Sequence, residues 1–198
     1  MAPRRSTTPI DPKEYKMARA FKNVITPVAT ASFTWLERPD SGFEFSDDKY
    51  KVTLLFDKES DEGRAFKQKM DEMTSELATQ EFGDKVKGIQ GPLKDGDETE
   101  KEDLHGHWFL RTKTKFQPGL IDCDSPPKPL SNGTFPRNGD KIRAAVKMFA
   151  YKAGAAKGVT AMLNTVQLVE QRNSESAGFD DIAGFVADSA TELGSDDF

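Results

Sequence analysis

The sequence predicts a mainly β protein: a small closed or partly open β-barrel with one inserted α-helix. Apolar and polar side chains alternate over several short segments, which is the period of a half-buried strand. One segment alone repeats its apolar residues every three or four positions, as an amphipathic helix does. Turn-forming residues separate the strand-like runs, as in small all-β folds.

Five strand-like segments are rich in β-branched and aromatic residues. In the second of them, the apolar side chains from Tyr50 to Phe56 occupy one face, while Lys51 and Thr53 occupy the other. This pattern indicates a strand with one buried face and one solvated face. The five segments are 24–36, 49–56, 106–119, 140–154 and 158–170.

The helix is expected over residues 60–82. Phe66, Met70 and Leu77, together with Met73, recur at spacings of three and four and therefore share one face. Ser60 or Asp61 stands where a helix cap is expected, and Gly83 stands where a helix commonly ends. The Gly-rich, acidic residues 84–103 that follow predict a solvated loop.

The charge of the chain is unevenly distributed. The whole sequence has 28 Lys and Arg against 33 Asp and Glu, a net charge of −5, but the last 26 residues hold seven of the acids and no Lys or Arg. The remaining 172 residues therefore carry a net charge of +2. We expect three parts: a flexible basic arm over 1–23, a barrel domain over 24–172 and a disordered acidic tail over 173–198.

Several function classes lack their motifs. The sequence has no phosphate-binding loop, dinucleotide-binding glycine motif or nucleophile elbow, so we expect neither an enzyme nor a bound cofactor. The only two histidines, His105 and His107, are too few to favour a metal site. No apolar run approaches the roughly 18–20 residues that span a bilayer, and the N-terminus lacks the apolar core of a secretory signal, so no membrane partner is expected.

Two of the strand-like segments place cations and aromatic rings on the same face. Residues 104–172, which contain both segments, hold eleven bases and four acids. Such a face suits single-stranded nucleic acid, because cations follow the phosphates and exposed rings stack on bases. The only helix expected is acidic, which argues against duplex binding. The candidate contact residues are Phe109, Arg111, Lys113, Lys115, Lys141, Arg143, Lys147, Phe149 and Tyr151, with Phe33 and Trp35 as second-rank candidates.

The acidic tail contains large apolar residues that a purely solvating segment would not need. If residues 180–193 became helical on binding a protein, one face would carry Ile182, Phe185, Val186 and Leu193. The tail can also compete with nucleic acid for a cationic groove. Three alternatives stay open: a solubilising sheet face with buried rings, an interaction module whose tail docks a partner, and an RNA-binding barrel. The tail residues expected to bind partners are Asp180, Asp181, Phe185, Asp196, Asp197 and Phe198.

The chain resembles the single-stranded DNA-binding proteins of lytic tailed phages, the phage T7 type. Tyr151 and Lys152 fall where that family contacts DNA, and so do Arg111 and the cations near it. Two positions differ from the family: Phe109 stands where a cation is expected, and Lys113 stands where an aromatic residue is expected. The tail is shorter and less acidic than in the phage T7 protein. The segments that carry the resemblance are FTWLERPD (33–40), YKVTLLF (50–56), WFLRTKTKF (108–116), KIRAAVKMFAYK (141–152), LNTVQLVE (163–170) and the terminal Asp-Asp-Phe (196–198).

The resemblance implies an OB-fold, a five-stranded barrel, that binds single-stranded DNA without sequence preference. It implies a role in phage DNA replication, recombination and repair, in the cytoplasm of the infected bacterial host. It also implies that the tail contacts phage or host replication proteins, such as the DNA polymerase and the primase-helicase, competes with DNA for the cleft and supports a homodimer.

Overall fold

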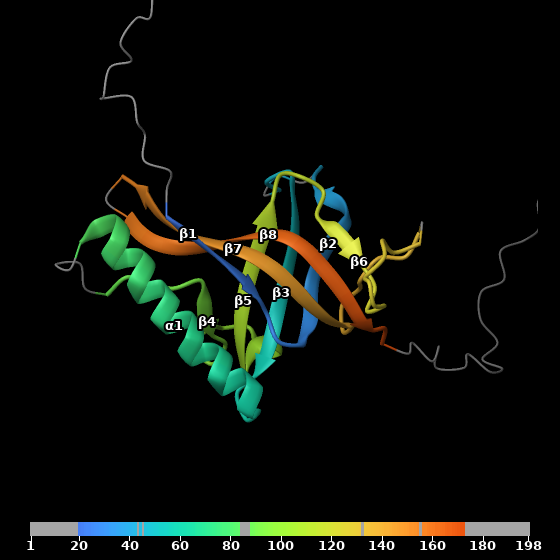
Figure 1. The fold of residues 1–198 in the computed structure, drawn as a ribbon, viewed down its shortest axis with the longest axis horizontal. Helices are drawn as coiled ribbons and strands as arrows, with labels where there is room; N and C mark the ends of the chain where they lie inside the picture. Colours follow the sequence, from blue (N-terminus) through green and yellow to red (C-terminus); the bar gives the residue numbers. More distant parts are fainter. Residues whose placement is uncertain are drawn as a thin grey trace, which may run out of the picture.

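The computed structural model describes residues 20–42, 44, 46–83, 88–131, 133–154 and 156–172. Residues 1–19 of the expected arm over 1–23 lie outside the described residues, as does the whole expected tail over 173–198. The elements, shown in Figure 1, are β1 (Phe21–Ile25), β2 (Ala29–Asp40), β3 (Lys49–Asp57), α1 (Asp61–Phe82), β4 (Leu93–Asp95), the 3-10 turn η2 (Glu102–Leu104), β5 (His107–Thr114), β6 (Gly119–Ile121), β7 (Lys141–Ala153) and β8 (Ala156–Glu170).

Five strands close into a ring in the order β2-β3-β5-β8-β7 and back to β2. The closing pair is short, with Ala29 opposite Ile142 and Thr30 opposite Lys141. Strands β5 and β8 run parallel, and the other neighbours within the ring are antiparallel. The predicted mainly β, OB-like barrel with one inserted helix is therefore confirmed.

The barrel interior is filled by the apolar face of each strand. Leu54, Leu110, Ile142 and Met148 have none of their surface exposed. Burial alternates along β7, where the apolar face from Ile142 to Ala150 points inward and the residues between them point outward. Apart from threonines such as Thr112, the buried side chains of the ring strands are apolar, so the charged residues of the ring face outward.

Helix α1 packs against β7 and β8 on one side of the barrel (Figure 1). Its N-cap is Ser60, whose hydroxyl accepts a hydrogen bond from the Gly63 N–H at 3.0 Å, and its C-cap is Gly83. Phe66, with Met70 and Leu77, forms the buried face that the spacing predicts. The Phe66 ring lies 4.6 Å from the ring of Phe56 at the end of β3.

Three elements depart from the sequence expectations. Strand β1 begins at Phe21, before the expected domain boundary at residue 24, and pairs with β7 rather than continuing into β2. The break falls at Pro27, which has no N–H to donate to a ladder. Within the expected loop 84–103, β4 pairs with β5 and η2 contacts it. Phe116, within the expected strand segment 106–119, lies past the end of β5 and is 80% exposed.

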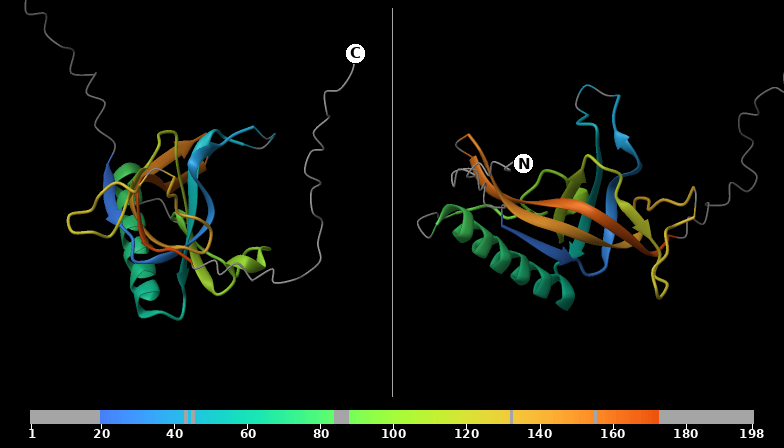
Figure 2. Two further views of the ribbon diagram at one scale, coloured as in Figure 1. Left: turned by 90° about the vertical axis from the view of Figure 1, so that its right-hand side faces the viewer. Right: turned by 45° about the horizontal axis from the view of Figure 1, so that its top comes forward.

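Strand pairs extend beyond the ring at two places. The β7–β8 hairpin reaches past the barrel toward the C-terminal end of α1, and the end of β2 and the start of β3 project from the barrel (Figure 2). In the part of the chain that the structure describes, no helix has both the length and the apolar character needed to cross a bilayer.

Candidate functional site

A groove of about 500 Å³ crosses the outer face of β2, β3, β5 and β8. Two aromatic rings stand on one side of it, and four cations contribute to its lining; we call these Lys51, Lys101, Arg111 and Lys113 the groove cations. The remaining lining comes from small or acidic residues. The full lining is Phe33, Trp35, Asp40, Asp47, Lys51, Val52, Thr53, Lys101, Arg111, Thr112, Lys113, Thr160 and Ala161.

The strand register brings these side chains together. Trp35 is opposite Lys51, Lys51 is opposite Lys113, and Lys113 is opposite Met162. Cross-strand partners share a face, so these residues form one row across four strands of the outer surface. The next row along β3 and β5 pairs Thr53 with Arg111. An aromatic ring, cations and small polar side chains are thus neighbours on one curved surface.

Phe33 occupies an irregularity in β2. Ser32 pairs with Thr53 and Trp35 with Lys51, so β2 has one residue more than β3 in this interval, which is a β-bulge. Phe33 has a φ of +49°, in the left-handed region that a bulky side chain rarely adopts. The bulge leaves the ring 42% exposed, and the Lys101 ammonium lies 4.7 Å from its centroid. Strain of this kind gathers at functional positions.

The groove cations are partly neutralised from within. Lys113 donates to Asp47 Oδ2 at 3.1 Å, and Lys51 Nζ lies 2.6 Å from Asp47 Oδ1 without hydrogen-bond geometry. Lys49 also donates to Asp47, at 3.2 Å, and Lys51 donates to Asp40 at 2.5 Å. Both carboxylates stand beside the turn between β2 and β3, so this turn supplies anions to the cationic face.

These contacts shift the ionisation of the groups involved. Burial alone would raise the pKa of Asp47, but the contacts with Lys51, Lys113 and Lys49 outweigh it and hold that pKa well below its usual range. Burial alone would lower the pKa of Lys51, and its contacts with Asp40 and Asp47 raise it instead. Asp47 and Lys51 are therefore both ionised at neutral pH.

The β5 residues predicted to contact nucleic acid divide into three groups. Arg111 and Lys113 line the groove, and Lys115 is exposed just beyond the end of β5. The expectation of an exposed ring at Phe109 is wrong, because only 2% of its surface is exposed. Strand β4 lies along β5 with Lys94 opposite Phe109, and the Arg111 guanidinium lies 4.9 Å from the ring.

The β7 candidates lie outside the groove lining. Lys147 shares the row of Met162, but its ammonium lies 3.7 Å from the centroid of the Phe21 ring on β1. Arg143 Nε donates to the carbonyl of Thr26 at 3.3 Å. Lys152 is exposed near the tip of the β7–β8 hairpin.

The two aromatic β7 candidates also remain predictions. Phe149 is half-buried and pairs with Thr160, which lines the groove. The Tyr151 ring packs over Gly158, where an added Cβ would stand 2.9 Å from it. Both rings therefore lie beside β8 rather than in the groove. Phe33 and Trp35, the second-rank candidates, are the rings that the groove contains.

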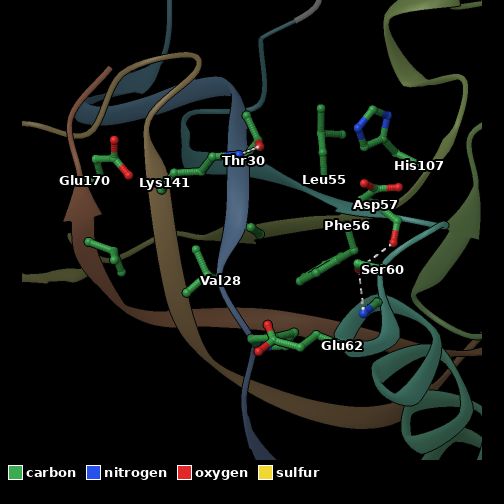
Figure 3. A pocket seen from close by; sticks show the side chains of 14 residues that line it. Val28, Thr30, Leu55, Phe56, Asp57, Ser60, Glu62, His107, Lys141 and Glu170 are labelled. Atoms are coloured by element: carbon green, nitrogen blue, oxygen red, sulfur yellow. Dashed lines mark hydrogen bonds between the residues drawn. The ribbon is translucent and has the colours of Figure 1, made fainter. Parts of the chain in front are cut away.

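Lys141 lies in a different hollow, drawn in Figure 3. There its ammonium donates to Thr30 Oγ1 at 2.9 Å. Asp57, Glu62 and Glu170 also line this hollow, so its acids would repel a phosphate chain. His107, in the same hollow, has its Nδ1 within 2.9 Å of the His105 carbonyl, which places that nitrogen against the backbone. Lys141 is therefore separated from the groove cations.

Sequence reasoning missed part of the groove. The alternation along residues 49–56 places Lys51 and Thr53 on the outward face of a strand, but only the pairing of β3 with β5 shows that this face continues the one bearing Arg111. Lys101 belongs to a segment that reads as a solvated loop, and no local signal distinguishes it. The tail candidates Asp180, Asp181, Phe185, Asp196, Asp197 and Phe198 lie outside the described residues.

The arrangement is suited to an extended anionic polymer with flat rings. Cations on β3 and β5 can contact successive phosphates, while Phe33 and Trp35 offer surfaces on which rings can stack. Stacking depends little on base identity, because every base has a π-face.

Comparison with known proteins agrees with this chemistry. A family model described as the single-stranded DNA-binding protein of Enterobacter phage Enc34 matches residues 22–192. A search of curated proteins found no match.

Three solved structures share the fold. The single-stranded DNA-binding protein of bacteriophage Enc34 in complex with single-stranded DNA has a TM-score of 0.62 and 19% identity, covering 75% of this chain and 86% of that one. The same phage protein in another structure has a TM-score of 0.61 and 18% identity, covering 80% and 87%. The gp2.5 single-stranded DNA-binding protein of bacteriophage T7 has a TM-score of 0.55 and 17% identity, covering 81% and 98%.

The Asp47 network predicts a pH-dependent stability. Because its folded-state pKa is lowered, the network contributes fully to the free energy of unfolding above the ordinary aspartate pKa of about 3.9, and the contribution is lost as the pH falls below that value. We expect Asp47→Asn to lower the free energy of unfolding by about 1 kcal/mol at pH 7. Urea denaturation should show a smaller difference in the free energy of unfolding between Asp47→Asn and the natural protein near pH 3 than at pH 7.

Asp48→Asn is the matched control. Asp48 is exposed and has a φ of +51°, a conformation that Asn also tolerates. It should change stability little at either pH. A constant difference between Asp47→Asn and the natural protein across this pH range would contradict the ion-pair explanation.

Proposed function

The chain belongs to the family of the single-stranded DNA-binding protein of Enterobacter phage Enc34, and we propose that its groove binds single-stranded DNA without sequence preference. The family is defined by binding, in agreement with the prediction that the chain is not an enzyme. We further propose a role in phage DNA replication and recombination, in the cytoplasm of the infected host.

The groove is the observation that carries this proposal. Two rings and four cations meet on one outer surface, and no helix among the described residues is placed as a recognition helix that would enter a duplex groove. The helix α1 is acidic over its length, with six acids against three bases, so phosphates would be repelled from it. Single strands, whose bases can be splayed onto Phe33 and Trp35, suit this surface better than a duplex.

The acidic tail is proposed to recruit replication proteins and to compete with DNA for the cationic face. One contact supports the competition: the Arg172 N–H donates to Asp140 Oδ1 at 2.8 Å, so the chain is held to the barrel immediately before residue 173. A tethered segment with seven acids has a high effective concentration near this surface. Tail-mediated dimerisation is a further proposal.

A fluorescence titration with oligo-dT tests the binding function. If the four groove cations neutralise four phosphates, the logarithm of the association constant should fall with the logarithm of salt concentration at a slope of about −3. A duplex of the same length should bind more weakly, and a matched RNA oligomer distinguishes DNA binding from RNA binding. Absent or salt-independent binding would rule out the proposal.

Phe33 tests whether the groove is the binding surface. Phe33→Ala replaces the benzyl side chain by a methyl group and so removes the stacking surface. It should weaken oligo-dT binding about 5- to 150-fold, corresponding to roughly 1–3 kcal/mol of stacking. Phe33→Trp should retain most of the affinity because it keeps a flat ring. Phe116→Ala is the matched control, since Phe116 is 80% exposed and does not line the groove.

Circular dichroism should show that each of these variants is folded. Equal losses for Phe33→Ala and Phe116→Ala would place the binding surface elsewhere.

Deletion of 173–198 tests the tail. We expect DNA binding to become tighter by several-fold at low salt, because a net charge of −7 is removed, with the gain shrinking at high salt as charges are screened. A gain that is independent of salt would argue against electrostatic competition. Loss of DNA binding would mean that the tail, and not the barrel, is the main binding element.

A further inference from the structure

We infer that the path of single-stranded DNA continues past Trp35 into a second hollow, which forms an outer nucleotide subsite. The inference rests on the proposed function and adds residues that the sequence did not single out. The hollow has a volume of about 310 Å³. The lining residues that matter here are Thr34, Trp35, Glu37, Arg38, Phe135 and Arg137.

The second hollow adjoins the groove, because Trp35 lines both. It arises where β2 departs from its neighbour: Trp35 pairs with Lys51, yet Asp40 pairs with Lys49, so four residues of β2 face one residue of β3. This departure frees β2 to meet the loop over 133–137 instead. At about 3.3 Å per residue, β2 extends roughly 16 Å from Phe33 to Arg38, enough for more than one nucleotide.

The loop that completes the hollow is fastened to the barrel. Asn138 Oδ1 accepts hydrogen bonds from the Thr34 N–H at 3.0 Å and the Thr34 hydroxyl at 3.1 Å. The Gly139 N–H also donates a hydrogen bond to the Ala31 carbonyl at 2.8 Å. Asp140, only 4% exposed, accepts from the Arg137 N–H at 2.7 Å. A loop held in this way loses little conformational entropy when a ligand binds.

The second hollow, like the groove, combines aromatic rings with cations, but its cations are arginines. Trp35 and Phe135 are half-buried rings with part of their surface accessible, and Arg38 and Arg137 are exposed. Arginine suits a phosphate chain, because its planar guanidinium can donate two parallel hydrogen bonds and can also stack on a ring. Rings beside guanidinium groups are the combination that single-stranded nucleic acid requires.

The cations of the second hollow differ from those of the groove in their ion pairing. Within the described part of the chain, no ion pair is formed by Arg38 or Arg137, and Glu37 is the one acid in the lining. In the groove, by contrast, Asp40 and Asp47 neutralise Lys51 and Lys113. A phosphate that enters the second hollow therefore meets arginines from which no ion-paired carboxylate has to be displaced.

An oligo-dT length series tests the outer subsite in the full-length chain. An oligomer of about 4 nucleotides should fill the groove alone, whereas one of about 12 should reach both hollows. The double variant Arg38→Gln with Arg137→Gln should lose about tenfold or more in affinity for the longer oligomer and less than twofold for the shorter. Its salt slope on the longer oligomer should be shallower by about 1.4, because two phosphates are no longer neutralised.

The control is the double variant Arg64→Gln with Lys128→Gln. It removes the same charge from exposed positions that lie outside both hollows and should bind both oligomers within twofold of the natural protein. Thermal melting should show that all variants are folded.

Three results would overturn the subsite. Equal losses on both lengths would mean that the arginines act within the inner site, and no loss on either would mean that they do not contact DNA. Tighter binding by the double variant would mean that the hollow holds the acidic tail instead. If the natural protein bound neither oligomer, the proposed function would itself fail, a result distinct from the three above.

Discussion

Closure of the barrel is the constraint on which the other features depend. The ring closes through the short pairing of β2 with β7, and the long β7–β8 hairpin joins that pair to β5. Once the ring is closed, every strand has one face in a dry interior, where burial of apolar surface contributes about 25 cal/mol per Å². Charged side chains must then lie on the outer face. The cationic face is a consequence of a core that admits no charge.

The regular pairing of β2 with β3 is interrupted at two places, and both candidate sites lie along β2. The bulge at Phe33 turns a ring outward, and the departure from β3 beyond Trp35 opens the space that the loop over 133–137 lines. A left-handed φ at a residue such as Phe33 costs roughly 1–2 kcal/mol. The closed and well-packed ring tolerates that cost because its stability comes from the interior, which the irregularities leave intact.

The acids in the groove oppose the function that its cations suggest. Asp47 holds Lys51 and Lys113 in fixed positions, which orders two long side chains before any ligand arrives. The same contacts reduce the net positive charge that a phosphate would meet. Ordering the two lysines in advance lowers the conformational entropy that is lost when DNA binds. Breaking their ion pairs with Asp47 costs energy, because each charge loses its partner. The affinity for DNA therefore depends on the balance of these two effects.

The sequence by itself determined the five strands of the ring and the helix, together with the alternation of apolar and polar side chains along them. Alternation along residues 49–56 and 141–151 and the spacing of Phe66, Met70 and Leu77 predicted the strands and the helix, because these periods depend only on local geometry. The uneven charge between the barrel and the tail could be counted directly.

Only the tertiary structure decided which outward residues meet. Arg111 and Lys51 are far apart in the chain and become neighbours through strand pairing, whereas Phe109, two positions from Arg111, is covered when β4 adds to the edge of β5. Pairing register and coverage by distant segments arise from contacts between remote parts of the chain. Local sequence patterns do not reveal those long-range contacts. Because the contacts determine which residues line the groove, its composition could not be predicted from the sequence.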